Sequence, residues 1–275
     1  MSRKLFCEIC PATYAISLQK NIMIRHVRNM MDKAEFAQTH QDVKLPVVIS
    51  AHGSNMIKRG PGIDPVLQQN KADNIRLACS KINGLVIKPG ETFSFWKCVG
   101  KTSKSNGFAE GRVLVNGKLI AGVGGGLCNL ANTIHLLVLD SPMTVTELHH
   151  HSDALAPDPN GVHVPYSAGT SVNYNFIDFR FRNDTDQPVQ LCTWCDADNL
   201  CAELRTTADY PWTYRLTEED HHFHKEANGK FYRVSKIYRE TISRKSGEVM
   251  KKELNWDNHS EVMFDYSLIP ESLIR

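Results

Sequence analysis

Four glycines lie within the five residues from Gly122 to Gly126, directly before an apolar stretch that runs to Leu139. Glycine adopts positive φ angles at little cost and lets backbones approach closely, so this run indicates a tight turn. The apolar stretch that follows is typical of a buried helix. Upstream, Asn116-Gly117 stands between two short β-type runs and predicts a two-residue hairpin. We therefore expect a hairpin, a glycine turn and a central helix in succession.

The patterns on either side predict an α+β fold. Helical spacing of apolar residues occurs early in the chain, over 11–40 and 67–83. Strand-like patterns dominate later, over 85–87, 92–96, 176–183, 188–194, 200–205, 230–243 and 248–266. The expected architecture has N-terminal helices, a central cysteine-bearing helix packed on antiparallel strands, and a β-rich C-terminal part. The expected divisions are an N-terminal helical segment (1–65), a core domain (66–215) and a C-terminal β-rich extension (216–275).

The charge balance argues against several classes of partner. The chain has 32 basic and 30 acidic residues and no basic stripe, so nucleic acid is not an expected partner. No apolar run approaches the roughly 18 residues of a membrane span. The basic start is followed by Glu8 and Pro11 rather than an apolar signal segment, so we expect a cytoplasmic protein with reduced thiols. The basic segment 11–40 fits either a packed surface helix or, less commonly, a membrane-surface helix.

Cys128 is the strongest candidate for chemistry, because it stands at the expected start of the central helix. Free amides and the helix dipole at such a position favour thiolate over thiol, and glycine amides can stabilise an oxyanion. His149, His150 and His151 follow about twenty residues later and are possible bases. A cysteine at a glycine-rich turn can equally be a small buried hydrophobe.

Several motifs occur in an order that resembles the VanW family over roughly residues 65–265. They are KPGETFSFW (88–96), GGGLCN (124–129), Glu147-x-x-x-His151-Ser152, PDPNG (157–161) and DFRFRN (178–183). The resemblance implies a bacterial protein connected with glycopeptide (vancomycin) resistance and the cell envelope, with no assigned reaction. The sequence departs from the family at Asn129 (usually Gln), Leu148 (usually Arg) and Gly169 (usually Asp). If that Asp orients a catalytic histidine, this chain lacks it at that position.

The enzyme hypothesis is a thiol-dependent hydrolase or acyltransferase. Cys128 would be the nucleophile and His151 the base, and Asn129 would join the Gly125 and Gly126 amides as oxyanion donors. Asp153, Asp158 or Asp178 could orient the histidine, although Asp178 could instead pair with an arginine for structural reasons. The expected substrate is a peptidoglycan stem peptide or its precursor. The residues expected to bind it are Gly124, Gly125, Gly126, Glu147, His149 and Ser152.

Two other hypotheses stay open, and no cofactor is expected. A metal site could use Cys128, His149 and His151, or the Cys7-x-x-Cys10 and Cys192-x-x-Cys195 pairs, although scattered thiols are the preferred interpretation of these pairs. A further cluster, His221-His222-Phe223-His224, is expected in a polar, acidic loop. The third hypothesis is a non-catalytic module that binds an envelope peptide or a protein partner. The sequence does not indicate an oligomeric state.

Overall fold

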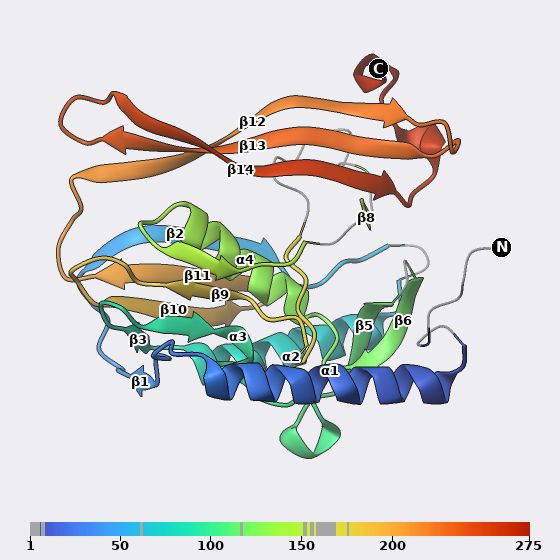
Figure 1. The fold of residues 1–275 in the computed structure, drawn as a ribbon, viewed down its shortest axis with the longest axis horizontal. Helices are drawn as coiled ribbons and strands as arrows, with labels where there is room; N and C mark the ends of the chain where they lie inside the picture. The colour runs from blue at the N-terminus through green and yellow to red at the C-terminus, as the bar shows by residue number, and fades with distance from the viewer. Residues whose placement is uncertain are drawn as a thin grey trace.

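A five-stranded antiparallel sheet forms the middle of the molecule (Figure 1). The structure is a computed structural model that describes residues 6, 9–60, 63–115, 118–150, 153–154, 157, 169–174 and 176–275. The strand order of the central sheet is β1-β3-β10-β11-β2. Its strands are β1 (Thr39–His40), β2 (Val47–Asn55), β3 (Leu85–Ile87), β10 (Val189–Asp196) and β11 (Asn199–Thr206). Two helices contact this sheet, α2 (Pro65–Ile82) and α4 (Leu127–Leu139).

Both core helices begin at residues suited to a helix start. Asp64 accepts hydrogen bonds from the amides of Val66 and Leu67, at 2.8 and 3.2 Å, and caps α2. Helix α4 begins after Gly126, whose φ of 103° lies in the region that only glycine adopts readily. The apolar side of α4 is completely enclosed by the core at Leu130, Ala131, Ile134 and Leu137.

Three further sheets surround this centre. A three-stranded antiparallel sheet has the order β4-β9-β7, with β4 (Thr92–Ser94), β7 (Thr144–Glu147) and β9 (Arg180–Arg182). A two-stranded hairpin is made of β5 (Glu110–Val115) and β6 (Lys118–Val123). The last sheet joins three long antiparallel strands to a short parallel one: β12 (Trp212–Lys225), β13 (Phe231–Ser243), β14 (Val249–Val262) and β8 (Asp153–Ala154). The long strands form a separate layer over the central sheet, and short 3₁₀ turns follow at 266–268 and 271–273 (Figure 1).

The α+β expectation is confirmed, including the hairpin, the glycine turn and the central helix. Several boundaries differ from the sequence pattern. Helix α1 (Pro11–Met31) ends at Met31, nine residues short of the expected 40, because the chain then turns to meet β4 through a bridge between Phe36 and Thr92. The expected strand 92–96 ends at Ser94, whose side chain caps the short helix α3 (Phe95–Val99).

Two corrections concern the C-terminal half. Only Arg180–Arg182 of the expected strand 176–183 pairs in a sheet. The histidine cluster at 221–224 is not in a loop, because it belongs to strand β12. Alternation of apolar residues does not predict strand β12, because most of its side chains are polar and half-exposed. Only Phe223 of this strand is fully buried.

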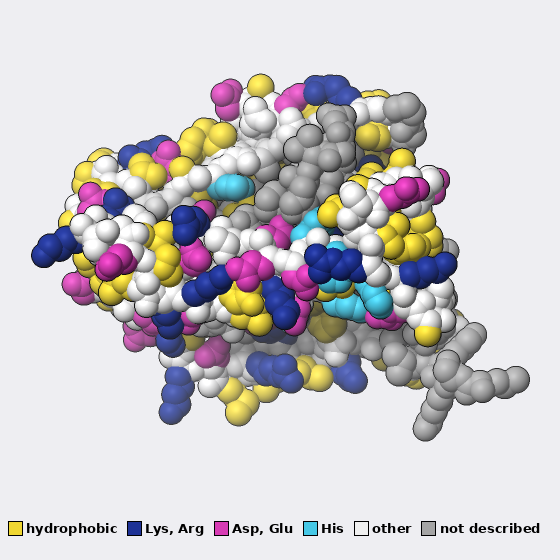
Figure 2. Space-filling model, turned by 90° about the horizontal axis from the view of Figure 1, so that it is seen from above, with side chains coloured by type: hydrophobic (Ala, Val, Ile, Leu, Met, Phe, Trp, Pro, Cys, Tyr) yellow, Lys and Arg dark blue, Asp and Glu magenta, His cyan; other side chains and the backbone are white. Residues whose placement is uncertain are grey.

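Helix α1 runs along the side of the molecule opposite the β12–β14 layer (Figure 1). Several of its apolar side chains stay exposed, including Ile16, Met23, Met30 and Met31. Elsewhere on the surface, basic and acidic side chains are interspersed, as Figure 2 shows for one face. Among the described helices, none combines the length and apolar character that a membrane crossing requires.

Candidate functional site

A cleft of about 630 Å³ lies at the start of α4. The glycine turn and Cys128 form one side of it, and the β5–β6 hairpin forms another. Residues 171–174 and Trp96 complete the wall, where the rings of Trp96 and Tyr174 meet edge to face at 5.5 Å between centroids. A cleft of this volume is in the range that holds a small ligand or a short peptide segment.

The glycine turn owes its composition to close packing. A Cβ on Gly124 would lie 2.7 Å from Cβ of Thr102, and one on Gly126 would lie 2.3 Å from Cγ of Lys71. A Cβ on Gly125 would lie 2.3 Å from the carbonyl carbon of Gly111, which is backbone and has no rotamer to change. The turn therefore needs glycine for steric reasons, independently of any catalytic role.

One buried side chain ties the turn to the hairpin. The Asn74 amide donates to the carbonyl oxygens of Ala109 and Gly125, both at 3.0 Å, and accepts from the Ala109 amide at 2.8 Å. Asn74 is 1% exposed and comes from α2. All its described contacts are to backbone, so it fixes the distance between the glycine turn and the start of β5.

Cys128 occupies the first turn of α4 and is partly exposed to the cleft. Its Sγ–H donates to the Val172 carbonyl oxygen at 3.7 Å. Burial raises the pKa of the Cys128 thiol, and its contacts with the Val172 backbone and its own amide only partly oppose this. The lowering expected from the helix dipole does not prevail, so the resting group is a thiol.

The predicted oxyanion donors are partly engaged within the fold. The Gly125 amide donates to the Gly122 oxygen at 3.2 Å, and the amide of the neighbouring Gly124, a predicted substrate-binding residue, donates to the Ala109 oxygen at 3.0 Å. Asn129 lines the cleft, but its Oδ1 accepts from Ser54 Oγ at 2.8 Å and its Nδ2 donates to the Asn55 oxygen at 3.2 Å. These contacts hold α4 on β2. The Asn129 amide donates to the Gly126 oxygen at 3.0 Å. The amides of Leu127 and Cys128 come before this bond in the first turn of α4 and are therefore better suited to an oxyanion.

The histidine side of the predicted site is only partly visible. His151 and Ser152 lie outside the described residues. His149 is exposed, and its Nε2 lies 3.3 Å from a Glu147 oxygen. No histidine is found among the described residues that line the cleft.

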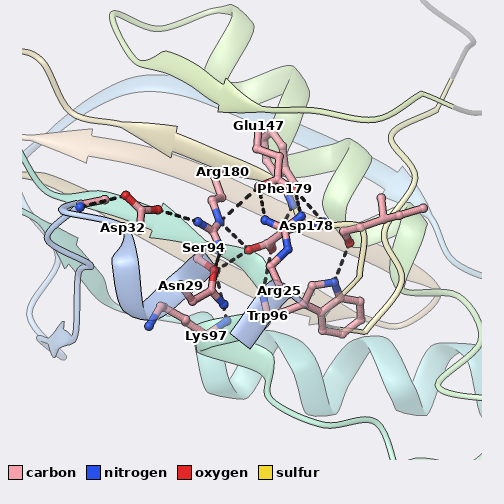
Figure 3. A network of polar contacts seen from close by, with 12 residues as sticks. Arg25, Asn29, Asp32, Ser94, Trp96, Lys97, Glu147, Asp178, Phe179 and Arg180 are labelled. Atoms are coloured by element: carbon pink, nitrogen blue, oxygen red, sulfur yellow. Dashed lines mark hydrogen bonds and ion pairs between the residues drawn. The ribbon is translucent and has the colours of Figure 1, made fainter. Parts of the chain in front are cut away.

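Glu147 and Asp178 take part in a polar network that fastens α1 to the β4–β9–β7 sheet (Figure 3). Glu147 makes a bidentate ion pair with Arg25 of α1 and accepts from the Asp178 amide at 3.2 Å. Although burial raises its pKa, Arg25 and then Arg180 bring the net pKa of Glu147 below its ordinary value. Glu147 is therefore an ion-pair partner of α1 and does not line the cleft.

Asp178 is 2% exposed and has both carboxylate oxygens occupied. Oδ2 accepts from Ser94 Oγ and Arg180 Nε, both at 2.7 Å. Oδ1 accepts from the amides of Trp96 and Phe179, at 3.1 and 2.9 Å. In the described residues its partners include no histidine, and the alternative structural role, pairing with an arginine, is the one these contacts support.

Sequence reasoning missed the cations of the cleft. Lys58, Lys71 and Arg112 all line it, and they come from the loop after β2, from α2 and from β5. Burial, followed by the charges of Lys58 and Arg112, lowers the pKa of Lys71 to about 8. No local pattern could have grouped these three residues, because only the tertiary fold brings their elements together.

The metal hypotheses find no support in the described ranges, where no group of three or more His, Cys, Asp or Glu side chains is arranged to hold an ion. Cys7 lies outside these ranges. Cys192 and Cys195 are three apart on β10, so their side chains project from opposite faces of the strand. Cys195 instead approaches Cys79 of α2, with 4.0 Å between the sulfurs.

The buried His135 of α4 leads to a prediction about acid stability. It is 4% exposed, and its Nδ1 lies 3.0 Å from Thr170 Oγ1. Burial, and then the nearby His150, lower its pKa to about 3. Because the unfolded state gains this proton near pH 6.5, the free energy of unfolding should fall by up to about 1.4 kcal/mol per pH unit as pH drops from 6.5 towards 3.

Chemical denaturation at several pH values measures this slope. In a His135→Gln variant the slope between pH 6.5 and 3 should be shallower, since the titrating group is gone while a polar partner for Thr170 is kept. Equal slopes in the two proteins would show that His135 does not have a lowered pKa.

Comparison with known proteins agrees with the motif order. A family model described as VanW like protein matches residues 70–205. The chain is 26% identical over 273 residues to the vancomycin B-type resistance protein VanW of Enterococcus faecalis, covering 99% of this chain and 98% of that protein. It is 30% identical over 123 residues to the uncharacterized protein YoaR of Bacillus subtilis, covering 45% of this chain and 39% of that protein. No solved structure matches it. The resemblance seen in the sequence is confirmed, and this chain belongs to the VanW family.

Proposed function

We propose that this protein is an accessory protein of glycopeptide resistance or cell-wall metabolism that acts as a thiol-dependent acyltransferase or hydrolase on a peptidoglycan-type peptide. The observation that carries the proposal is the position of Cys128, on the first turn of α4 and open to a peptide-sized cleft. The full-length similarity to a vancomycin B-type resistance protein supports the physiological context. The proposed location is the cytoplasm, where the thiols stay reduced and the peptide would be a precursor.

In the proposed reaction a base takes the proton from Cys128 Sγ as the sulfur attacks a peptide carbonyl carbon. The first amides of α4 hold the oxyanion of the tetrahedral intermediate. The C–N bond then breaks, the departing amine takes the proton, and a thioester remains on Cys128. An amine or water attacks the thioester and restores the thiol. The proposed base is His151, and one is required because burial keeps the resting thiol protonated.

The test is detection of the thioester. Incubation with a peptide that ends in D-alanyl-D-alanine should add one acyl group to the protein, measured by intact mass spectrometry, and hydroxylamine should remove it. Cys128→Ser should abolish the hydroxylamine-labile adduct. His151→Ala should slow acylation by about 10²–10⁴-fold. Cys201→Ser is the matched control, since Cys201 is a partly exposed thiol outside the cleft.

Two results together would contradict the proposed enzyme activity. They are the absence of an acyl adduct and a rate of Cys128 labelling by iodoacetamide that is the same in His151→Ala as in the unsubstituted protein. That outcome would favour a second function, a binding module for the same class of peptide. The raised pKa of the Cys128 thiol is the observation that favours this alternative, because an inert thiol suits binding without chemistry.

A further inference from the structure

We infer that the Cys128 cleft recognises a carboxylate of its peptide ligand through Lys58, Lys71 and Arg112. This inference names the chemical group that the proposed function recognises. It rests on the proposed function, because that function is what identifies the ligand as a peptide. The group would bind as an anion, without any covalent step of its own.

The three cations share one cleft in which the structure describes no acidic side chain. They reach it from three separate elements of the fold. In the part of the chain that the structure describes, no carboxylate lies within ion-pair distance of any of them. The described residues that line the cleft include no aspartate or glutamate. Arg25 and Arg180, by contrast, each have a carboxylate partner.

Like charges that face one another without a partner are unfavourable, and an anion relieves the repulsion. Burial of the Lys71 ammonium group, followed by the charges of Lys58 and Arg112, lowers the pKa of Lys71 to about 8. Among the described residues, these two cations, Cys128 and Tyr174 are the titratable or charged groups that line the cleft with Lys71. A bound carboxylate would supply the missing negative charge.

The position of Lys71 places this anion beside the thiol. Its side-chain stem crosses Gly126, since a Cβ there would lie 2.3 Å from Lys71 Cγ. Gly126 is the N-cap of α4 and stands two residues before Cys128. The rings of Trp96 and Tyr174 line the same cleft and offer apolar contact to the rest of a ligand. A carboxylate on the cations therefore brings a neighbouring peptide bond towards Cys128. This mixture of charged and aromatic walls favours a peptide carboxylate over free phosphate.

Calorimetric titration of the Cys128→Ser protein tests the inference, because this variant removes any thioester chemistry. The ligands are a peptide that ends in D-alanyl-D-alanine with a free carboxylate and the same peptide as its C-terminal amide. The free carboxylate should bind at least ~10-fold more tightly than the amide, as expected for a charge-assisted contact. Its affinity should fall as pH rises through about 8, where Lys71 loses its proton, and binding near that pH should take up protons.

A second substitution distinguishes the loss of the Lys71 charge from a loss of folded structure. Lys71→Met in the same background should weaken carboxylate binding by ~10-fold or more and leave amide binding unchanged. Lys71→Arg should restore most of the preference. Lys104→Met is the control, because Lys104 is exposed, is paired with Glu110 and lies outside the cleft. Circular dichroism checks that each variant is folded.

Equal affinity for the carboxylate and the amide would overturn the inference. So would tight binding of inorganic phosphate that depends on Lys71 while the two peptides bind alike, since the cleft would then recognise phosphate. Unchanged carboxylate preference in Lys71→Met would also overturn it. If Lys71→Met in the protein that keeps Cys128 then abolished acylation, Lys71 would be assigned to proton transfer. Failure of the thioester assay leaves all these titrations interpretable, so the proposed function and the inference fail separately.

Discussion

Replacing Asp178 with alanine is expected to lower the free energy of unfolding by about 3–5 kcal/mol. The substitution leaves the guanidinium of Arg180, which is 6% exposed, without its closest counter-charge. It also removes the acceptor of the Ser94 hydroxyl and of the Trp96 and Phe179 amides. Leaving buried donors unsatisfied adds to the cost of the unpaired charge. Urea denaturation monitored by circular dichroism measures the change.

The neighbouring pair Arg182–Asp184 provides the matched control. It has the same separation of two residues, but both side chains are substantially exposed, at 47% and 40%. Asp184→Ala should therefore cost about 0–1 kcal/mol. If Asp178→Ala and Asp184→Ala cost the same, Asp178 does not stabilise the fold as described. Asp178→Asn, which keeps an acceptor, should remain folded and show unchanged labelling of Cys128 if the role of Asp178 is structural.

A second large effect is expected for Gly125→Ala, a loss of about 2–4 kcal/mol in the free energy of unfolding. The new Cβ would stand 2.3 Å from the Gly111 carbonyl carbon and 2.7 Å from the Arg112 amide nitrogen. Both are backbone atoms, so the strain moves the hairpin or the turn rather than a side chain. The same denaturation experiment measures the loss.

Gly53→Ala is the control for a glycine with ordinary surroundings. Gly53 lies on β2, and a Cβ there would meet its nearest neighbour, the Leu200 oxygen, at 3.4 Å. Its substitution should change the free energy of unfolding by about 0.5 kcal/mol or less. A Gly125→Ala protein as stable as Gly53→Ala would mean that the turn and hairpin are not in the close contact described.

Local patterns predicted the elements whose side chains alternate clearly between core and solvent. The hairpin at Asn116-Gly117, the glycine turn and the apolar helix α4 follow from their own residues. Strand β12 could not be found in this way, because most of its side chains are polar and only Phe223 is fully buried. The end of α1 was misplaced because a long-range bridge decides it.

The candidate site was predictable only where it is continuous in sequence. Cys128, Asn129 and the glycines lie together in the chain and line one cleft. The cations Lys58 and Lys71 are separated from this motif along the chain, and each looks like an ordinary surface charge in the sequence. The structural role of Asp178 stayed open for a similar reason. An arginine two residues away was visible, but the contacts with Ser94 and the α3 backbone come from a distant segment.

The buried Asn74 contact with the hairpin and the glycine turn has a consequence for how relatives could diverge. The thiol belongs to a helix fixed in the central core, whereas Arg112 belongs to a two-stranded sheet with no other strand partner in the described chain. Asn74 binds only backbone atoms on the two sides, so it holds any hairpin sequence that preserves the backbone there. Under the proposed function, selection could therefore exchange the hairpin that carries Arg112 while the helix that carries Cys128 stays constant. If Arg112 takes part in the proposed carboxylate recognition, transplanting a hairpin between family members would transfer ligand preference without rebuilding the core.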